Sequence, residues 1–192
     1  LFNLRRMLMN KSFIIKIILL CLVTIKVSAI EKVILFGDSL MAGYGLPNEQ
    51  HLSVILQNSL EVEGHNIEII NGSVSGSTSA GGLNIAEWTL SENNIDLMIL
   101  CLGANDMLRG INPKETKNNL EEIIKIAKSK NIKVIIAGMI APTSYGYSYK
   151  KSFDKIFSDL SKKYKLQLIP FLLEGVAQKP EFNLSDGMHP ND

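Results

Sequence analysis

Five short runs of apolar residues recur along the chain, separated by longer stretches of mixed apolar and polar residues. The runs are rich in Val, Ile and Leu without polar alternation, which is typical of strands buried on both faces of a sheet. They predict strands at residues 32–37, 67–71, 95–102, 132–138 and 166–169. Strands that alternate with helices favour right-handed crossovers, so we expect a single-domain α/β fold with a parallel sheet covered on both sides.

Three of the intervening stretches carry apolar residues at helical spacing and predict amphipathic helices. They are residues 52–64, 113–131 and 148–164. In the second stretch, Pro113 stands at a position suited to the first helical turn. Glu121 precedes Lys125 by four residues, a spacing that favours an ion pair along the helix.

Polar, glycine-rich segments follow the first three predicted strands: GDSLMAG, NGSVSGSTSAGG and GANDMLRG. In open parallel sheets, ligands bind outside the carboxyl ends of the strands, which is where these segments fall. Ser39 follows the first strand directly. It is either a nucleophile or the cap of the next helix, because Asp and Ser are both favoured N-cap residues.

A serine nucleophile needs an adjacent base, and the chain has three histidines. His51 and His65 suit solvated surface positions. His189 lies in SDGMHPND, three residues after Asp186. A tight turn there would let the carboxylate hold one imidazole nitrogen and leave the other free to face a serine. The alternative is an ordinary Asp-Gly turn with an exposed histidine.

The segments after the second and third strands supply candidate donors for an oxyanion. Gly76 would allow close approach of its backbone N–H, and Asn105 would offer its side-chain amide. Each has a simpler interpretation, Gly76 as loop flexibility and Asn105 with Asp106 as a helix cap. No His and Cys residues have the spacing of metal ligands, so we expect neither a metal nor another cofactor.

The distribution of charge argues against a nucleic-acid partner. Five of the 20 basic residues and none of the 19 acidic residues lie in residues 1–29. The rest of the chain therefore has four more acidic than basic side chains, which gives no electrostatic reason to bind nucleic acid.

Residues 1–29 have the pattern of a signal peptide. Basic residues precede an apolar run at residues 17–25, and small residues lead to Ala29. This predicts cleavage after Ala29 and export to the periplasm or the medium. The run is far shorter than the ~20 residues that span a bilayer, so we expect no stable membrane insertion after cleavage. The alternative is a retained anchoring helix.

Four segments resemble, in order and spacing, the four sequence blocks of the SGNH, or GDSL-type, hydrolase family: FGDSL, Gly76 in NGSVSG, GAND and DGMHP. The longer stretches FGDSLMAGYGL, LGANDMLRG and PFLLEGVAQKPEF look most like the exported bacterial thioesterase/arylesterase/lysophospholipase group. The resemblance implies one hydrolase domain over residues 30–192, with a flavodoxin-like, three-layer α/β/α fold around a five-stranded parallel sheet. It also implies a final helix, which this sequence, ending at Asp192, lacks.

The resemblance implies roles for the residues that match its blocks. Ser39 would be the nucleophile, His189 the general base and Asp186 the acid that orients the base. The Ser39 N–H, the Gly76 N–H and the Asn105 side chain would form the oxyanion hole.

Other side chains receive supporting roles. Asp38 and Asp106 are expected to make structural hydrogen bonds within their own loops. Tyr145 and Tyr147 are expected in the wall of an acyl-binding site, although they would equally suit packing of their loop.

The implied activity is hydrolysis of acyl esters or thioesters of lysophospholipase, thioesterase or arylesterase type, by a monomer acting on small molecules and preferring medium or long acyl chains. A carbohydrate acetylesterase is the first alternative. A non-catalytic phosphate- or nucleotide-binding module is another, but NGSVSGSTSAGG matches neither the P-loop nor the G-x-G-x-x-G pattern. An α/β-hydrolase would place its serine in G-x-S-x-G, unlike GDSLM.

Overall fold

The computed structural model of the chain describes residues 30–91 and 94–191. Five parallel strands form one sheet in the order β2-β1-β3-β4-β5. The strands are β1 (Lys32–Gly37), β2 (Glu68–Asn71), β3 (Leu97–Cys101), β4 (Lys133–Ala137) and β5 (Gln167–Ile169). Each lies inside its predicted range, so the predicted parallel sheet is confirmed. The strand order is the flavodoxin-like one. The predicted signal peptide lies outside the described residues.

The described residues also form six α-helices and three short 3₁₀ helices. The α-helices are α2 (Ser39–Ala42), α3 (Leu52–Val62), α4 (Ser79–Thr89), α5 (Ala104–Leu108), α6 (Pro113–Ser129) and α7 (Tyr147–Tyr164). The 3₁₀ helices are η1 (Asn48–Gln50), η2 (Thr143–Tyr145) and η3 (Pro180–Phe182). Helices α3, α6 and α7 confirm the three predicted helices. Over the described ranges, none of the helices is long and apolar enough to cross a membrane.

Helix α4 begins inside the segment that the sequence indicated as a glycine-rich loop. Thr78 caps it, because the Thr78 side chain accepts a hydrogen bond from the Gly81 N–H. Glycine is unfavourable inside a helix, but Gly82 lies at a close contact between α4 and the core. A Cβ at Gly82 would lie 2.3 Å from a methyl of Leu102, so a larger residue there would require the buried Leu102 side chain to shift.

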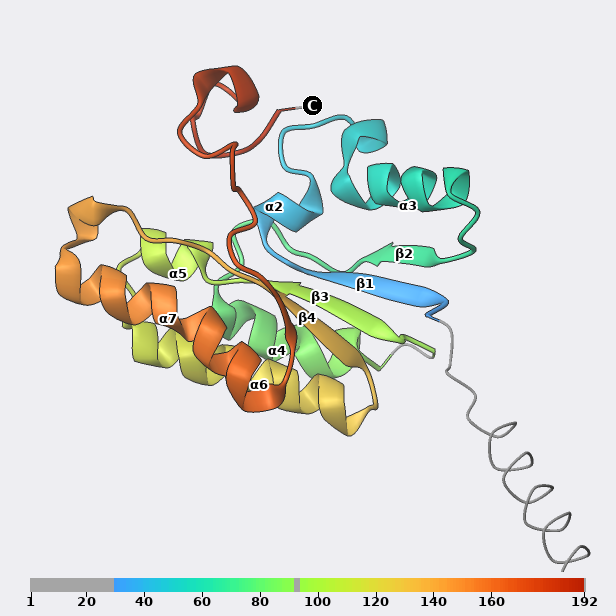
Figure 1. The fold of residues 1–192 in the computed structure, drawn as a ribbon, viewed down its shortest axis with the longest axis horizontal. Helices are drawn as coiled ribbons and strands as arrows, with labels where there is room; N and C mark the ends of the chain where they lie inside the picture. The colour runs from blue at the N-terminus through green and yellow to red at the C-terminus, as the bar shows by residue number, and fades with distance from the viewer. Residues whose placement is uncertain (1–29, 92–93, 192) are drawn as a thin grey trace, which may run out of the picture.

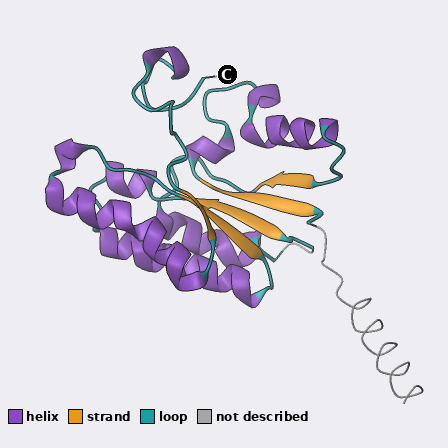
Figure 2. Ribbon diagram, in the orientation of Figure 1, coloured by secondary structure: helices purple, strands orange, loops and turns teal. Residues whose placement is uncertain are grey.

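Helices lie on both faces of the sheet, as predicted (Figures 1 and 2). Helices α4, α6 and α7 cover one face, where alternate strand residues such as Ile34, Phe36 and Leu100 join the main core. On the opposite face, α2 packs against β1 and α3 against β2. A smaller cluster there includes Leu35, Met41 and neighbouring side chains. Both faces of β1 are therefore buried, which fixes the position of the residues that follow it.

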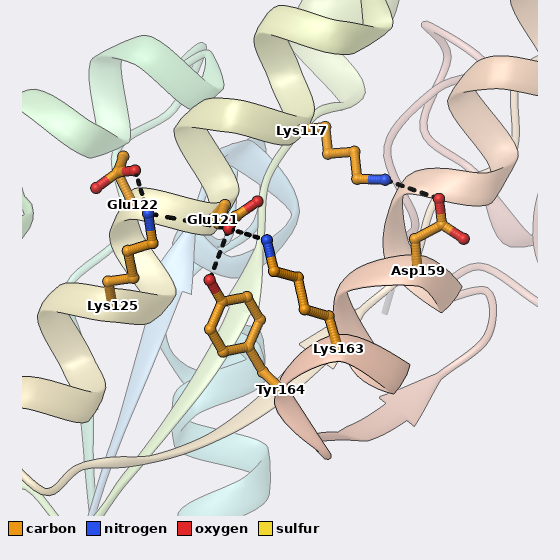
Figure 3. A network of polar contacts seen from close by, with 7 residues as sticks. All are labelled: Lys117, Glu121, Glu122, Lys125, Asp159, Lys163 and Tyr164. Atoms are coloured by element: carbon orange, nitrogen blue, oxygen red, sulfur yellow. Dashed lines mark hydrogen bonds and ion pairs between the residues drawn. The ribbon is translucent and has the colours of Figure 1, made fainter.

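A network of polar side chains joins α6 and α7 on the outer surface of the helix layer that covers the main core (Figure 3). Glu121 accepts hydrogen bonds from Lys163 and from the Tyr164 hydroxyl, at 2.5 and 2.6 Å. The predicted pair of Glu121 and Lys125 is present at 3.9 Å, but Lys125 lies closer to Glu122, at 2.7 Å. The predicted pair is therefore present, but it is longer than the contact of Lys125 with Glu122 in the same helix and than those of Glu121 with α7.

Candidate active site

Ser39 is the first residue of α2, immediately beyond the carboxyl end of β1. Asp38 is the N-cap of this helix and accepts a hydrogen bond from the Leu40 N–H at 3.2 Å. The sheet order reverses between β1 and β3, and ligands of such sheets bind at this switch point. Ser39 follows β1 and Asn105, in α5, follows β3, so both candidate residues lie at the switch point.

Asp186 and His189 share a tight turn in the C-terminal segment. The Leu184 N–H donates to the His189 carbonyl at 2.7 Å, and the Gly187 N–H donates to the Leu184 carbonyl at 2.9 Å. Gly187 has a φ of 68°, a left-handed conformation that favours glycine. Asp186 Oδ1 accepts from the backbone N–H groups of Met188 and His189, at 2.8 and 3.0 Å. The turn therefore positions the carboxylate beside the imidazole.

The His189 ring bridges Asp186 and Ser39. Its Nδ1 lies 2.7 Å from Asp186 Oδ2, and its Nε2 lies 2.9 Å from Ser39 Oγ. An ionised carboxylate only accepts hydrogen bonds, so in the neutral ring Nδ1 carries the hydrogen. The lone pair of Nε2 then faces the serine hydroxyl. This is the geometry required for a serine–histidine–aspartate triad, and the structure brings together all three residues that the sequence predicted for it.

Two carboxyl groups near the triad have pKa values shifted in opposite directions. Hydrogen bonds from the Met188 N–H and from the ring and backbone of His189 lower the pKa of Asp186 to about 2. Burial raises the pKa of Asp38 to about 6, although the Leu40 N–H and the nearby Asn105 side chain lower it in part. Asp38 Oδ2 is buried and has no hydrogen-bond partner among the described residues. Asp186 is therefore the carboxylate that remains ionised beside His189.

The residues predicted for an oxyanion hole lie on three separate elements. Gly76 occupies a turn in which the Ser77 N–H donates to the Val74 carbonyl, and its φ of 76° places it in the left-handed region. The N–H groups of Ser39 and Gly76 donate to no acceptor within the described ranges. The Asn105 side chain lies against Asp38, the residue before Ser39. The Ser39 N–H is therefore a free donor beside the serine hydroxyl, and the turn of Gly76 is joined to the end of β1 by the bond from the Val74 N–H to the Gly37 carbonyl.

Asp106 does not act within its own loop, contrary to the sequence-based expectation. It is fully buried, and its carboxylate accepts from the Ser79 N–H at 2.7 Å and from the hydroxyls of Ser79 and Thr116. These partners belong to α4 and α6. A buried carboxylate requires several donors, and here they come from neighbouring helices, so Asp106 joins three elements behind the site.

The expectations for the two other histidines and for the two tyrosines have mixed outcomes. His51 is not a solvated residue, because its ring packs over Gly43 and its Nε2 lies 3.1 Å from the Leu46 carbonyl. His65 is exposed, as expected. Tyr145 stacks on Tyr149, with ring centroids 5.4 Å apart, and no described contact joins it to the triad. Tyr147 is 79% exposed and has Lys151 over its ring.

Three residues contact the site that the sequence analysis did not single out. The Tyr44 ring packs against His189 with centroids 4.5 Å apart. Arg109 donates to the Gly76 carbonyl at 3.0 Å. The Asn183 side chain donates to the carbonyls of Val176 and Lys179, and so holds the segment that precedes the turn. Tyr44 and Arg109 lie within the motifs FGDSLMAGYGL and LGANDMLRG, which was the available signal.

The chain is similar in sequence and in structure to known ester hydrolases. Residues 35–192 match the profile of the GDSL-like Lipase/Acylhydrolase family. An arylesterase of Vibrio mimicus is 39% identical over 162 residues, which covers 84% of this chain and 81% of the relative. The thioesterase 1/protease 1/lysophospholipase L1 of Escherichia coli strain K12 is 31% identical over 90% of this chain and 81% of the relative. The crystal structure of AlinE4, an SGNH-hydrolase family esterase, superposes with a TM-score of 0.79 at 38% identity, over 86% of this chain and 89% of that one.

Proposed function

Because the chain belongs to the GDSL-like lipase/acylhydrolase family, we propose that it is a serine hydrolase that cleaves carboxylic esters and thioesters. The observation that carries the proposal is the continuous contact from Asp186 through His189 to Ser39. Asp38 and not Ser39 is the N-cap of α2, so helix capping does not account for the contact of Ser39 with the imidazole.

The contacts fit a two-step acyl transfer. Ser39 Oγ attacks the carbonyl carbon while His189 Nε2 takes the hydroxyl proton across their 2.9 Å contact. The negative charge on the former carbonyl oxygen is stabilised by the N–H groups of Ser39 and Gly76 and by the Asn105 amide. His189 then protonates the leaving alcohol or thiol. Water repeats the sequence on the acyl-enzyme and releases the acid.

The rim of the site supports substrates with apolar acyl groups. Five exposed apolar side chains lie on the segments that follow the carboxyl ends of β1 to β4 or on the turn of His189: Tyr44, Val74, Leu108, Ile140 and Met188. Each is between 42% and 53% exposed. We therefore propose a preference for medium or long acyl chains over acetyl groups, whether the leaving group is an aryl alcohol, a thiol or the glycerophosphodiester of a lysophospholipid.

The test is hydrolysis of p-nitrophenyl esters by the wild-type protein and by Ser39→Ala, His189→Ala and Asp186→Asn, each checked for folding by circular dichroism. Loss of several orders of magnitude in the folded Ser39 and His189 variants is expected. Ser144→Ala and His65→Ala replace exposed residues of the same types away from the triad and serve as matched controls. A fluorophosphonate should label the wild-type protein and not Ser39→Ala. Full activity in Ser39→Ala would leave Ser39 as the first residue of α2 with no catalytic role.

A chain-length series tests the substrate preference separately. Turnover should rise from acetyl to octanoyl and dodecanoyl esters at equal concentration. Equal or faster cleavage of acetyl esters, and of an acetylated sugar above all, would favour the carbohydrate acetylesterase instead.

We also propose that residues 1–29 are a signal peptide and that the exported protein is a monomer. Amino-terminal sequencing of the protein recovered from the periplasm or medium should begin at Ile30. Light scattering of that product should give the mass of one chain. Recovery of the uncleaved chain with the membranes would support an anchoring helix.

A further inference from the structure

The Arg109 side chain reaches the turn that carries Gly76. Its Nη2 donates to the Gly76 carbonyl at 3.0 Å, across 33 positions of the sequence. Arg109 is the C-cap of α5, four residues after Asn105. The same short helix therefore carries one proposed oxyanion donor and contacts the residue that supplies another.

The base of the Gly76 turn is fixed by β1. The Val74 N–H donates to the Gly37 carbonyl at 3.0 Å, and the Ser73 hydroxyl donates to the Leu35 carbonyl at 2.9 Å. The tip of the turn, around Gly76, is held by fewer contacts than its base. A Cβ at Gly76 would meet no atom within 4 Å, so no side chain packs over that face of the residue. Apart from the turn's own bond between Ser77 and Val74, the described hydrogen bond that holds the tip is the one from Arg109.

The orientation of the Gly76 N–H depends on this tip. The bond from Ser77 to Val74 and the positive φ of Gly76 are the features of a type II turn with Gly76 in its third position. In such a turn the N–H of the third residue is not used inside the turn. Its direction follows the rotation of the central peptide, which joins Ser75 to Gly76. The Gly76 carbonyl belongs to the next peptide, so a contact there restrains the central peptide through the φ and ψ angles of Gly76.

Helix α5 provides a fixed point from which Arg109 can act. Asp106 joins it to Ser79 in α4 and to Thr116 in α6 through buried hydrogen bonds. The Arg109 N–H also donates to the Asn105 carbonyl at 3.1 Å. The guanidinium has no acidic partner within the described ranges, so the carbonyl contact is not secondary to an ion pair.

We propose that Arg109 is a positioning residue that aligns the Gly76 N–H with the Asn105 amide for stabilisation of the oxyanion. This proposal rests on the proposed function, since it assigns a task within the same site. Arg109 touches neither the triad nor the reacting carbonyl. It acts through the Gly76 peptide, and it should matter more in the transition state than in the bound ester, where the carbonyl oxygen carries little charge.

The test uses Arg109→Met, which keeps an unbranched apolar side chain without donors, and Arg109→Ala, which leaves space for added guanidinium. Loss of a whole oxyanion donor costs about 10²–10³ in kcat, so a donor that is present but misaligned should cost about tenfold. KM for a p-nitrophenyl ester should stay close to that of the wild-type protein. The Ki of a trifluoromethyl ketone, whose adduct carries an oxyanion, should rise by the same factor as kcat falls.

Guanidinium at millimolar concentration, far below the denaturing range, should restore part of the kcat of Arg109→Ala and should not affect Arg109→Met. Lys155→Ala removes a positive charge from an exposed position on α7 and should leave every parameter unchanged. It is the matched control for the change in net charge.

Three results would overturn the proposal. Wild-type kcat in Arg109→Met is one, and a fall in kcat without a change in the Ki of the ketone is another. A rise in KM alone would assign Arg109 to substrate binding. In each case the wild-type protein still hydrolyses esters and is labelled at Ser39. If instead the wild-type protein hydrolyses no ester and is not labelled by a fluorophosphonate, the proposed function itself fails.

Discussion

Ser39 and His189 lie 2.9 Å apart in the site, but the chain supports them in different ways. Ser39 follows a strand in which Leu35 and Phe36 are completely buried, and its neighbours Asp38 and Met41 are buried too. His189 belongs to residues 170–191, which contain one short 3₁₀ helix and no strand, and residues 185–188 are exposed. In Figure 1 this segment (red) passes α2 on its way to the C-terminus.

The difference indicates what each half of the triad depends on. The position of Ser39 depends on the hydrophobic core, so a change that moves it should also lower the free energy of unfolding. The position of His189 depends on a few polar contacts, among them those of Asn183 and Asp186. A change there should reduce activity with little effect on global stability.

Gly37→Ala should displace Ser39, the half of the triad that the hydrophobic core supports, and have the largest effect. A Cβ at Gly37 would lie 2.6 Å from the Cys101 carbonyl oxygen and 2.8 Å from Met41 Cγ, so the strand end or α2 must shift. We expect the free energy of unfolding to fall by about 3 kcal/mol, together with loss of esterase activity. Urea denaturation followed by circular dichroism and an ester assay would measure both. An unchanged unfolding midpoint would mean that this strand end is not closely packed.

Asn183→Ala should displace His189, the other half of the triad, without unfolding the protein. Its buried side chain holds the carbonyls of Val176 and Lys179, and its backbone pairs with Pro190. Displacement of His189 by about 1 Å is expected to cost roughly 100-fold in kcat. The change in melting temperature should be small, because the core is untouched. Ser185→Ala, an exposed substitution in the same segment, is the control. A large loss of stability with normal kcat would place Asn183 in the global fold instead.

The pKa shifts of Asp38, beside Ser39, and of Asp186, beside His189, predict that their contributions to the free energy of unfolding depend on pH in opposite directions. Burial raises the pKa of Asp38 in the folded state to about 6. The folded protein therefore holds a proton that the unfolded chain loses near pH 4, and this contribution to stability is lost as pH rises from about 4 through 6. Asp186, with a lowered pKa of about 2, stabilises the fold above pH 4, and its contribution is lost as pH falls towards 2.

Asp38→Asn separates these contributions. Asparagine keeps an acceptor for the Leu40 N–H and removes the titration. It should raise the free energy of unfolding at pH 7 relative to the wild-type protein, on the order of 2 kcal/mol, and flatten the decline between pH 4 and 6. The decline below pH 4 should remain. Chemical denaturation across this pH range measures both, and an undiminished slope between pH 4 and 6 would show that Asp38 is not its source.

The same distinction explains which features the sequence could predict. Most residues of β1 and β3 are buried, so the apolar runs of these strands mark them within one or two residues. The triad was predictable because its residues lie in two recognisable motifs, one after the end of β1 and one in the C-terminal segment. Helix α4 was missed because Gly81 and Gly82 are locally unfavourable in a helix, and the close contact of Gly82 with Leu102 is tertiary.

The supporting contacts of the site depend on tertiary structure. The partners of Asp106 lie on α4 and α6, and those of Arg109 and Tyr44 are 33 and 145 positions away. No local pattern in the sequence encodes contacts at such separation. They become visible only when the loops at the carboxyl ends of the strands are brought together.

Tyr44 offers the test with the smallest expected effect, because it joins the two halves of the triad. It follows α2, the helix that carries Ser39, and its ring packs against the ring of His189. Tyr44→Ala should lower kcat by about threefold, since the lost aromatic contact restrains the imidazole only in part. Tyr44→Phe should match the wild-type protein, because no described residue bonds to the Tyr44 hydroxyl. If Phe were as poor as Ala, the hydroxyl rather than the ring would connect the two halves. If Ala were fully active, the bonds to Asp186 and Ser39 alone would suffice to hold His189.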